Sequence, residues 1–331
     1  MRFTDRSRYV TGLNCLRKRF WQYHFDGRGI APAIEAQPLM LGSAVHLGLQ
    51  SLLSGETPAM AIKAALAGMP DAQEGDLLEN QAMVIALMLG YHRAGLAKLL
   101  EEFEVIECER EIWCDLPESE TRLLARSDAL LRERSSGMLI CQSFKTCARL
   151  FPADLQSAQR NLQNFTEPYV YSADLARRHA ANKLPFAWDR QEAPRVEGVR
   201  LDFMIKGQKR SWGEETISAS PLIYGYASKH GMEDYAWQWE WQGSDGKQHR
   251  LSAAHWERFA VGLQVRWGAT LEERITHWLD MLQGMEGDAL GQQFIADDVI
   301  IVTPEQAAQF ARQFDMEEKR IAARGSSPMD D

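Results

Sequence analysis

Between residues 105 and 146 the hydrophobic period changes from helical to alternating, and this change constrains the fold more than any other feature. In VIECEREIWCDL (105–116), apolar residues alternate with acidic ones, so a single strand would place on one face the carboxylates of Glu107, Glu109, Glu111 and Asp115. TRLLARSDALLRE (121–133) and GMLICQSFKT (137–146) follow as two further strands, separated by the turn-like RSSG. Together the segments predict a β-meander.

Helical periodicity surrounds the predicted meander. Residues 14–25 and LMLGSAVHLGLQSLL (39–53) have apolar residues at helical spacing, and at least two helices are expected over 58–102. Residues 153–182 return to a helical composition, and VRLDFMIKG (199–207) reads as a fourth strand. This order predicts an α/β fold with a mixed central sheet flanked by helices.

The composition is that of an ordinary folded protein. Of the 331 residues, 45% are hydrophobic and 25% are charged, which excludes collagen-like, disulfide-framework and wholly disordered classes. The net charge of −9 means that contact with nucleic acid requires a local basic patch. Five cysteines without a CxxC pair predict a reducing cytoplasm, and neither a signal peptide nor an apolar run of roughly 18 residues is recognised, so no membrane contact is expected.

Three residues carry candidate chemistry, and each also has an ordinary structural interpretation. His46 in GSAVHLGL lies on a predicted helix, where a histidine usually packs or caps. Asp128 in ARSDALL interrupts an apolar strand pattern, where an acid costs free energy unless it is paired, hydrogen-bonded or metal-bound. Lys145 in SFKT ends a strand, where a lysine is usually solvated. Their order along the chain is what favours a shared site.

That order resembles the RecB-like branch of the PD-(D/E)XK nuclease superfamily over about residues 10–180. NCLRKRFWQYHF followed by LGSAVHLGL is similar to the first motif of the family, RSDALL to its aspartate motif, and LICQSFKT to its (D/E)xK motif. LQNFTEPYVYSADLARR resembles the following helix, which usually carries Gln and Tyr. A phage and prophage subgroup looks similar in WQYHFDGRG, SFKT, IKGQKR and SPLIYGY.

The resemblance implies a restriction-endonuclease-like core and metal-dependent cleavage of DNA. It assigns His46 and Asp128 to the metal, Mg²⁺ or Mn²⁺, and Lys145 to the attacking water and the scissile phosphate. It also implies catalytic roles for Gln163 and Tyr169 on the helix that follows. Phosphodiester hydrolysis needs such a set, because a divalent cation neutralises the phosphate and acidifies a water while a lysine stabilises the transition state.

One position departs from the family pattern. The residue two before Lys145 would be Asp or Glu, since positions two apart on a strand share a face, but here it is Ser143. Gln142 should point to the opposite face unless a bulge re-aims it. Glu109 or Glu111, on a neighbouring strand, is the better candidate for the missing metal ligand, and the alternative for both is a solvated strand-edge glutamate.

Cysteine positions test a further family feature. Some RecB-like nucleases hold an iron–sulfur cluster with one Cys upstream of the histidine motif and three near the C-terminus. No Cys follows Cys147, so no iron–sulfur cluster is expected. Cys15 is instead expected to be buried as a small apolar residue.

Basic and aromatic residues near the N-terminus offer a nucleic-acid surface, made of Arg17, Lys18, Arg19, Phe20, Trp21 and Tyr23. Rings beside cations can grip a single strand, but an amphipathic helix whose rings fill the core is the favoured interpretation of the aromatic residues. Arg177 and Arg178 fit equally well as phosphate contacts or as a solvated helix end near the helix dipole.

The predicted domain organisation has three parts. A nuclease-like core covers 1–206 and includes a helical insertion over about 50–102, a Trp-rich C-terminal extension covers 207–318 and packs on the core, and a disordered tail covers 319–331. Within the extension, alternation predicts a strand with Trp237, Trp239 and Trp241, and helices are expected around Trp256, Trp267 and Trp278.

The function expected from the sequence is a cytoplasmic, metal-dependent deoxyribonuclease. DNA is the expected partner, and a recombination, replication or defence protein is a further candidate. The chief rival is a catalytically inactive nuclease-fold protein that binds DNA or a protein partner, since Ser143 removes an expected ligand. A helix-rich assembly or adaptor protein that binds no nucleic acid is the third interpretation, and it leaves the ordered His, Asp and Lys motifs to chance.

Overall fold

The computed structural model describes most of the first 205 residues and selected segments beyond them. The described residues are 2–23, 29, 37–69, 75–147, 150, 152–205, 208–212, 215–219, 239–242, 248–251, 294–296 and 299–323. For residues 37–38, 75–79 and the segments between 208 and 296, only the backbone is described.

Among the described residues, two sheets of three or more strands form the central β structure. The larger sheet has the order β12-β7-β6-β5-β2, with β13 also pairing β7, and its strands are β2 (Phe103–Cys108), β5 (Ala129–Glu133), β6 (Leu139–Cys147), β7 (Val196–Ile205), β12 (Phe294–Ala296) and β13 (Ile300–Ile301). β6 and β7 are parallel and the other pairs are antiparallel, so this sheet is mixed, as the sequence predicts. The smaller sheet has the order β1-β4-β3, with β1 (Arg2–Thr4), β3 (Glu111–Leu116) and β4 (Thr121–Arg126).

Two separate hairpins follow β7 in the chain. The first joins β8 (Gln208–Trp212) to β9 (Glu215–Ala219), and the second joins β10 (Trp239–Gln242) to β11 (Gln248–Leu251). Trp239 and Trp241 therefore lie on a strand, as their alternation predicts. Trp237, Trp256, Trp267 and Trp278 lie outside the described residues.

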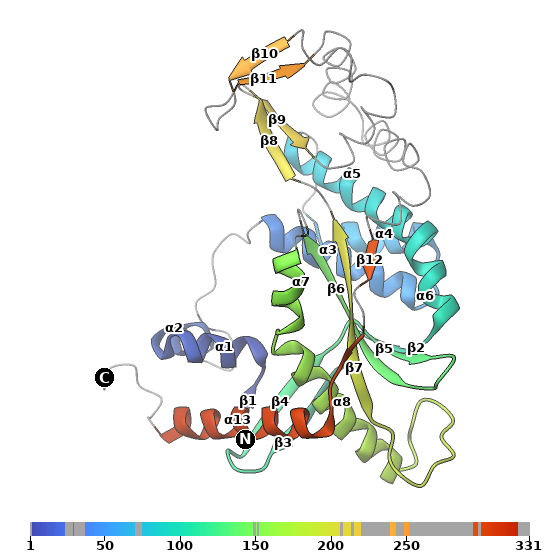
Figure 1. Cartoon of the computed structure of the whole chain (residues 1–331), viewed down its shortest axis with the longest axis vertical. Helices are drawn as coiled ribbons and strands as arrows, with labels where there is room; N and C mark the ends of the chain where they lie inside the picture. The colour runs from blue at the N-terminus through green and yellow to red at the C-terminus, as the bar shows by residue number, and fades with distance from the viewer. Residues whose placement is uncertain are drawn as a thin grey trace.

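Helices cover both faces of the larger sheet (Figure 1). The helices of the described residues are α1 (Arg6–Asn14), α2 (Leu16–Tyr23), α3 (Gln37–Leu53), α4 (Pro58–Ala67), α5 (Gly75–Gly90), the π-helical turn η1 (Tyr91–Leu96), α6 (Ala97–Glu102), α7 (Pro152–Gln159), α8 (Gln163–Ala180) and α13 (Pro304–Ala323). α3 to α6 form one hydrophobic core with the sheet, whereas α8 and α13 form a second core that also includes the smaller sheet. This arrangement confirms an α/β architecture with a helix-covered mixed sheet.

Side chains of β6 alternate between these two cores. Ile140 and Phe144 belong to the core with α3 to α6, whereas Cys141 belongs to the core with α8. Ser143 and Lys145 face α8 as well, because both contact its first residue. The alternation follows from strand geometry, and it places the (D/E)xK-like motif against α8.

The strand prediction over 105–116 is wrong in one respect. The chain leaves the strand at Glu109, whose φ of 48° lies in the left-handed region, and β2 and β3 therefore belong to different sheets. The segment 121–133 is broken in the same way at Ser127 and Asp128, between β4 and β5. The two breaks lie side by side, since the N–H of Glu109 donates to the carbonyl oxygen of Asp128 at 3.1 Å.

A long apolar helix also departs from expectation. α5, η1 and α6 form a continuous run over Asn80–Glu102 that could cross a membrane by length and composition, so the prediction that no segment reaches this length is wrong. Within the fold, 56% of its apolar window is buried, and Met88 and Leu99 lie in the core with α3. Burial in that core accounts for the apolar composition.

The C-terminal segments return to the core. β12 and β13 pair with β7, and α13 packs through Phe310 and Phe314 on the second core. Asp315 of α13 accepts two backbone N–H groups of the β3–β4 turn, at 2.7 and 2.8 Å. Because α13 continues to Ala323, the prediction of a disordered tail from 319 is wrong for 319–323, and residues 324–331 lie outside the described residues.

Candidate metal centre

His46, Glu109 and Asp128 converge on one point from three segments of the chain. His46 lies on α3, and the two acids occupy the paired strand breaks. One ligand atom from each residue can be chosen so that all lie within 4.8 Å of one another. The Nδ1 atom of His46 is 2.9 Å from Oδ1 of Asp128 and 4.0 Å from Oε1 of Glu109. The structure thus forms a possible three-residue metal site.

Glu109 owes its position to the break after β2. Its left-handed backbone costs about 1–2 kcal/mol for a residue with a Cβ, and the bond to the Asp128 carbonyl offsets part of that cost. Arg126 holds the outer carboxylate oxygen, with its Nε 3.1 Å from Oε2 of Glu109. Glu111 begins β3 and is exposed. Of the two acids considered as replacements, Glu109 lies in the cluster and Glu111 does not.

Asp128 is the most strongly held member of the cluster. Its Oδ1 faces His46, and its Oδ2 accepts the backbone N–H of Phe144 on β6 at 2.5 Å. Burial raises the pKa of Asp128, but the hydrogen bond and charge of His46, the Phe144 N–H and the charge of Lys145 outweigh burial and hold the pKa below its usual range. The residue is therefore a carboxylate in the folded protein.

The pKa values of His46 and Glu109, the other two members, are both raised. Burial lowers the pKa of His46, but the hydrogen bond and charge of Asp128 and the charge of Glu109 raise it above the ordinary value. Burial and then the charge of Asp128 raise the pKa of Glu109 to about 7, against the opposing charge of Arg126. Both shifts mean that the cluster favours an added positive charge, whether a proton or a cation.

The donor set fits a divalent cation. Imidazole nitrogen and carboxylate oxygen are common ligands for such ions. The three ligand atoms lie within 4.8 Å of one another, so His46, Glu109 and Asp128 could hold one ion between them. One imidazole and two carboxylates are ligands that several divalent metals accept.

Lys145 follows Phe144, whose backbone N–H donates to Asp128, so strand β6 brings the lysine to the triad. Its Nζ donates to Oε1 of Gln163 at 2.8 Å, and Nε2 of Gln163 donates to Ser143 Oγ at 3.0 Å. Ser143, at the position where the family pattern has an acid, therefore anchors the amide that holds the lysine.

Glu167 is a charged group near the site that the sequence analysis missed. It is only 3% exposed and its Oε1 accepts from Nε2 of Gln163 at 2.5 Å. Burial raises the pKa of Glu167 to about 8, with the charge of Lys145 acting in the opposite direction. The available signal was the spacing of four residues between Gln163 and Glu167, which places both on one face of α8.

Tyr169 does not lie with these residues. Its side chain packs against the second core, which contains Phe310 and Phe314 of α13. Tyr171 instead supports the strand breaks, since its hydroxyl donates to the carbonyl of Arg110 at 3.0 Å and accepts from the N–H of Ser127 at 3.4 Å. The tyrosine of α8 that contacts the strand breaks is thus Tyr171, two residues after Tyr169.

Gln142 lies on the face of β6 opposite to Ser143. It is fully buried. The backbone of β6 pairs with β5 and β7 without a bulge at this position. Gln142 is therefore not re-aimed toward the triad, as strand alternation predicts.

The predicted basic surface on α2 is divided. Arg17 and Lys18 are exposed, whereas Arg19 forms two bonds with the carboxylate of Glu318 on α13, at 2.8 and 2.7 Å. This ion pair between Arg19 and Glu318 joins α2 to α13 and occupies the guanidinium group of Arg19. Two of the three cations are thus free of such a carboxylate clamp among the described residues.

The prediction that the α2 rings fill the core is wrong. No residue of α2 is fully buried, and Trp21 is 44% exposed. Phe20 contacts Trp21 edge-on, with ring centroids 5.2 Å apart, and Tyr23 lies under Arg8. A helix of eight residues at the surface has too little packed area to bury all three rings.

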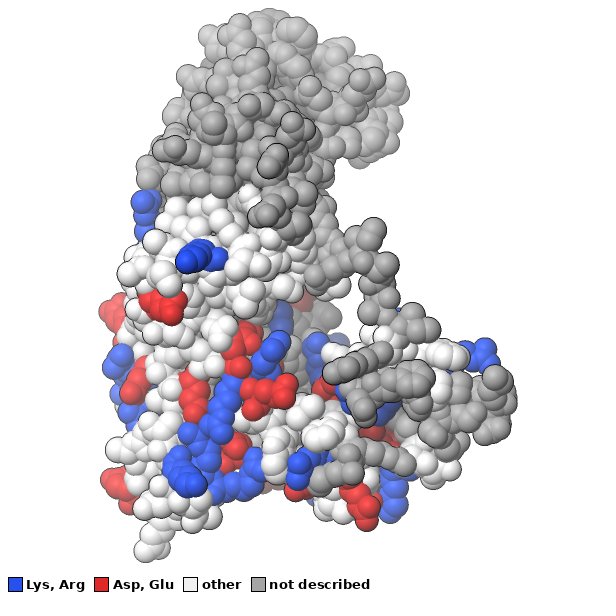
Figure 2. All heavy atoms as spheres, turned by 180° about the vertical axis from the view of Figure 1, so that it is seen from behind, with Lys and Arg blue, Asp and Glu red and all other residues white. Residues whose placement is uncertain are grey.

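Arg177 and Arg178 are engaged with the protein. Arg177 donates to Asp174 at 2.9 Å and stacks on Trp113 with a separation of 4.1 Å. Arg178 lies 2.8 Å from a carboxylate oxygen of Glu107 and is 16% exposed, so it is not a solvated helix end. On the face drawn in Figure 2, Lys and Arg side chains are likewise interleaved with Asp and Glu.

Cys15 is exposed, so the prediction of a buried Cys15 is wrong. The residue lies at the junction of α1 and α2, where its Sγ accepts the N–H of Lys18 at 3.4 Å. Its position at the start of a surface helix explains the exposure.

Comparison with known proteins adds no family assignment: no protein-family model matches the chain, and no curated protein matches it. What the structure supports is an α/β fold with a mixed sheet and a His, Glu and Asp group that could hold a metal ion.

Proposed function

We propose that this protein is a divalent-metal-dependent nuclease that hydrolyses phosphodiester bonds of DNA in the cytoplasm. The observation that carries the proposal is the convergence of His46, Glu109 and Asp128 within 4.8 Å, with Lys145 beside them. Metal ligands next to a lysine are what the chemistry requires, because negative charge builds up on the phosphate during the reaction.

Each residue has a separate role in the proposal. His46, Glu109 and Asp128 would hold Mg²⁺ or Mn²⁺, which when bound supplies positive charge to the phosphate and makes a water more acidic. Lys145 stabilises the charge that develops on the phosphate oxygens. Gln163 orients the lysine, because its Oε1 accepts a hydrogen bond from Lys145 Nζ at 2.8 Å. Its Nε2 donates to Ser143 Oγ, which fixes the amide in place.

The test is cleavage of fluorescent DNA substrates in Mg²⁺ or Mn²⁺. We expect Lys145→Ala to reduce the cleavage rate by about 10²-fold or more while sparing most of the DNA affinity, which depends on many phosphate contacts. Asp128→Ala should abolish both cleavage and Mn²⁺ binding measured by calorimetry. Lys98→Ala, on the exposed side of α6, is the matched control and should cleave like the wild type.

Cleavage that survives Lys145→Ala would refute the proposal, because it would come from another site or another protein. The second candidate, an inactive nuclease-fold protein that binds DNA, is favoured by the engagement of Ser143 with Gln163, which leaves the usual acidic position without a ligand. If neither the wild type nor Ser143→Asp cuts any DNA substrate while both bind it in a salt-sensitive way, that candidate replaces ours.

A further inference from the structure

Arg6, the first residue of α1, reaches the same amide as Lys145. Its Nη1 donates to Oε1 of Gln163 at 3.2 Å, the oxygen that also accepts from Lys145 Nζ at 2.8 Å. The same Nη1 donates to Oδ1 of Asn161 at 2.9 Å. The charged ends of two cations, from α1 and from β6, thus lie within two hydrogen-bond lengths of each other.

The hydrogen-bond partners of this pair are neutral. Several other arginines of the described residues instead lie against carboxylates, as Arg19 lies against Glu318 and Arg200 against Asp202. For Arg6 and Lys145, the described hydrogen-bond acceptors are amide oxygens. Two like charges that share one neutral acceptor repel each other, and an anion placed between them would remove that repulsion.

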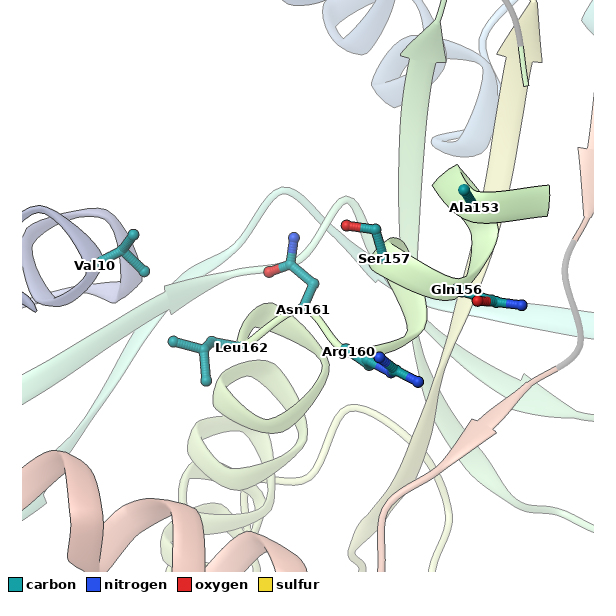
Figure 3. A pocket seen from close by; sticks show the side chains of 7 residues that line it. All are labelled: Val10, Ala153, Gln156, Ser157, Arg160, Asn161 and Leu162. Carbon is teal, nitrogen blue, oxygen red and sulfur yellow. The ribbon is translucent and has the colours of Figure 1, made fainter. Parts of the chain in front are cut away.

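An open groove lies directly beside the pair. It has a volume of about 500 Å³ and is formed by α1, α7 and the connection to α8, with side chains that include Val10, Gln156, Ser157, Arg160, Asn161 and Leu162 (Figure 3). Asn161 belongs both to the groove and to the contacts of Arg6, so the groove and the cation pair are contiguous. No carboxylate is among the groove's described lining residues, and Arg160 adds an exposed cation.

We propose that Arg6 is a second phosphate-binding residue of the site, and that the groove carries the DNA nucleotide next to the scissile phosphate. The proposal rests on the nuclease function proposed above and adds the path of the substrate. A single DNA strand fits the groove. The groove volume lies within the range of about 300–1,000 Å³ for pockets that bind small organic groups. The amides, the hydroxyl and the arginine that line it match a phosphate and its sugar.

Glu167 does not cancel the pair. The charges of Lys145 and Arg6 both act on its carboxyl, yet its hydrogen bond goes to Gln163 and neither cation lies within ion-pair distance of it among the described contacts. The amide of Gln163 therefore bonds the buried acid through Nε2 and the two cations through Oε1, and both cations have partly exposed side chains.

The experiment measures DNA binding apart from cleavage. A 5′-fluorescein-labelled single-stranded 20-mer is titrated with protein in CaCl₂, and the dissociation constant is determined by anisotropy over a series of NaCl concentrations. We expect Arg6→Ala to weaken binding roughly tenfold and to lower the slope of log affinity against log salt by about 0.7, the value for one phosphate contact on a single strand. Arg160→Ala should have a similar, independent effect.

Two variants control for charge and fold. Arg6→Lys keeps the cation and should retain the wild-type slope. Arg8→Ala is the matched control, since Arg8 lies on the same helix but is paired with Asp5 at 3.3 Å and with the carbonyl of Phe3 at 2.8 Å, and it should leave the slope unchanged.

The outcomes separate this inference from the proposed function. If the wild type cleaves DNA while Arg6→Ala keeps the salt slope and the cleavage parameters, the inference is refuted and the nuclease function stands. If the wild type does not cleave but Arg6→Ala lowers the slope, the phosphate site is supported and the nuclease function is refuted. A loss of thermal stability in Arg6→Ala with an unchanged slope would show that the pair is structural, which also refutes the inference.

Discussion

Replacing Glu167 with Gln should change how the stability of the protein depends on pH. Burial raises the pKa of this carboxyl to about 8, above its ordinary value of 4.5. Between these two values the folded state holds a proton that the unfolded state releases, so the unfolding free energy of the wild type falls as the pH rises. Glu167→Gln removes the titrating group but keeps the amide-sized side chain, and this contribution to the pH dependence disappears.

The magnitude follows from the pKa difference. One proton corresponds to a slope of about 1.4 kcal/mol per pH unit, so between pH 5.5 and 7.5 the variant should gain up to about 2.7 kcal/mol of stability relative to the wild type. The geometry agrees with a neutral carboxyl, because Oε2 of Glu167 has no hydrogen-bond partner among the described residues and the group is 3% exposed. An ionised Oε2 would be buried without a hydrogen bond of its own among the described residues.

The assay is urea unfolding followed by tryptophan fluorescence at pH 5.5, 6.5 and 7.5, with the unfolding free energy extrapolated to water. Only the difference between the variant and the wild type is used, since other groups titrate in both proteins. Glu101→Gln, at an exposed position of α6, reports the effect of removing one surface charge. Parallel curves for wild type and Glu167→Gln would refute the reasoning, because they would mean that Glu167 is ionised in the folded state.

Three further predictions concern the site and its surroundings. Glu109→Gln should weaken Mn²⁺ binding more than tenfold in calorimetry, whereas Glu111→Gln should bind like the wild type; equal effects would remove Glu109 from the ligand set. Ser143→Asp should fail to raise the DNA cleavage rate, because it breaks the bond to Gln163 and adds negative charge to a site where Glu109 already supplies the second acid, and a large increase would contradict this assignment. Arg178→Ala should lower the unfolding free energy by about 1–3 kcal/mol and leave DNA affinity unchanged; weaker DNA binding without destabilisation would instead make it a phosphate contact.

The strands could be predicted from the sequence where strand and turn signals are clear. The strand over 137–146 and its turn correspond to β6 and the β5–β6 turn, where Gly137 has a φ of 76° that favours glycine. Helical structure over 153–182 was predicted from composition, and the structure divides it into α7 and α8. The hydrophobic period of one segment, however, does not indicate which other segment it contacts. The burial of Glu167 and the pairing of Arg178 with Glu107 were therefore not predicted.

The interrupted strands explain both the success and the limit of the sequence analysis at the metal site. A strict alternation over 105–116 predicts Glu107, Glu109 and Glu111 on one face, and in that case no single acid among them would be selected. The left-handed backbone at Glu109 breaks this equivalence: it turns one carboxyl toward His46, while Glu111 continues into the other sheet. Such a break leaves no trace in a hydrophobic pattern, because glutamate itself has no preference for that conformation. Glu109 therefore reaches the candidate metal site through a backbone conformation that depends on the neighbouring break at Asp128, a contact that forms only when the two strand pairs come together.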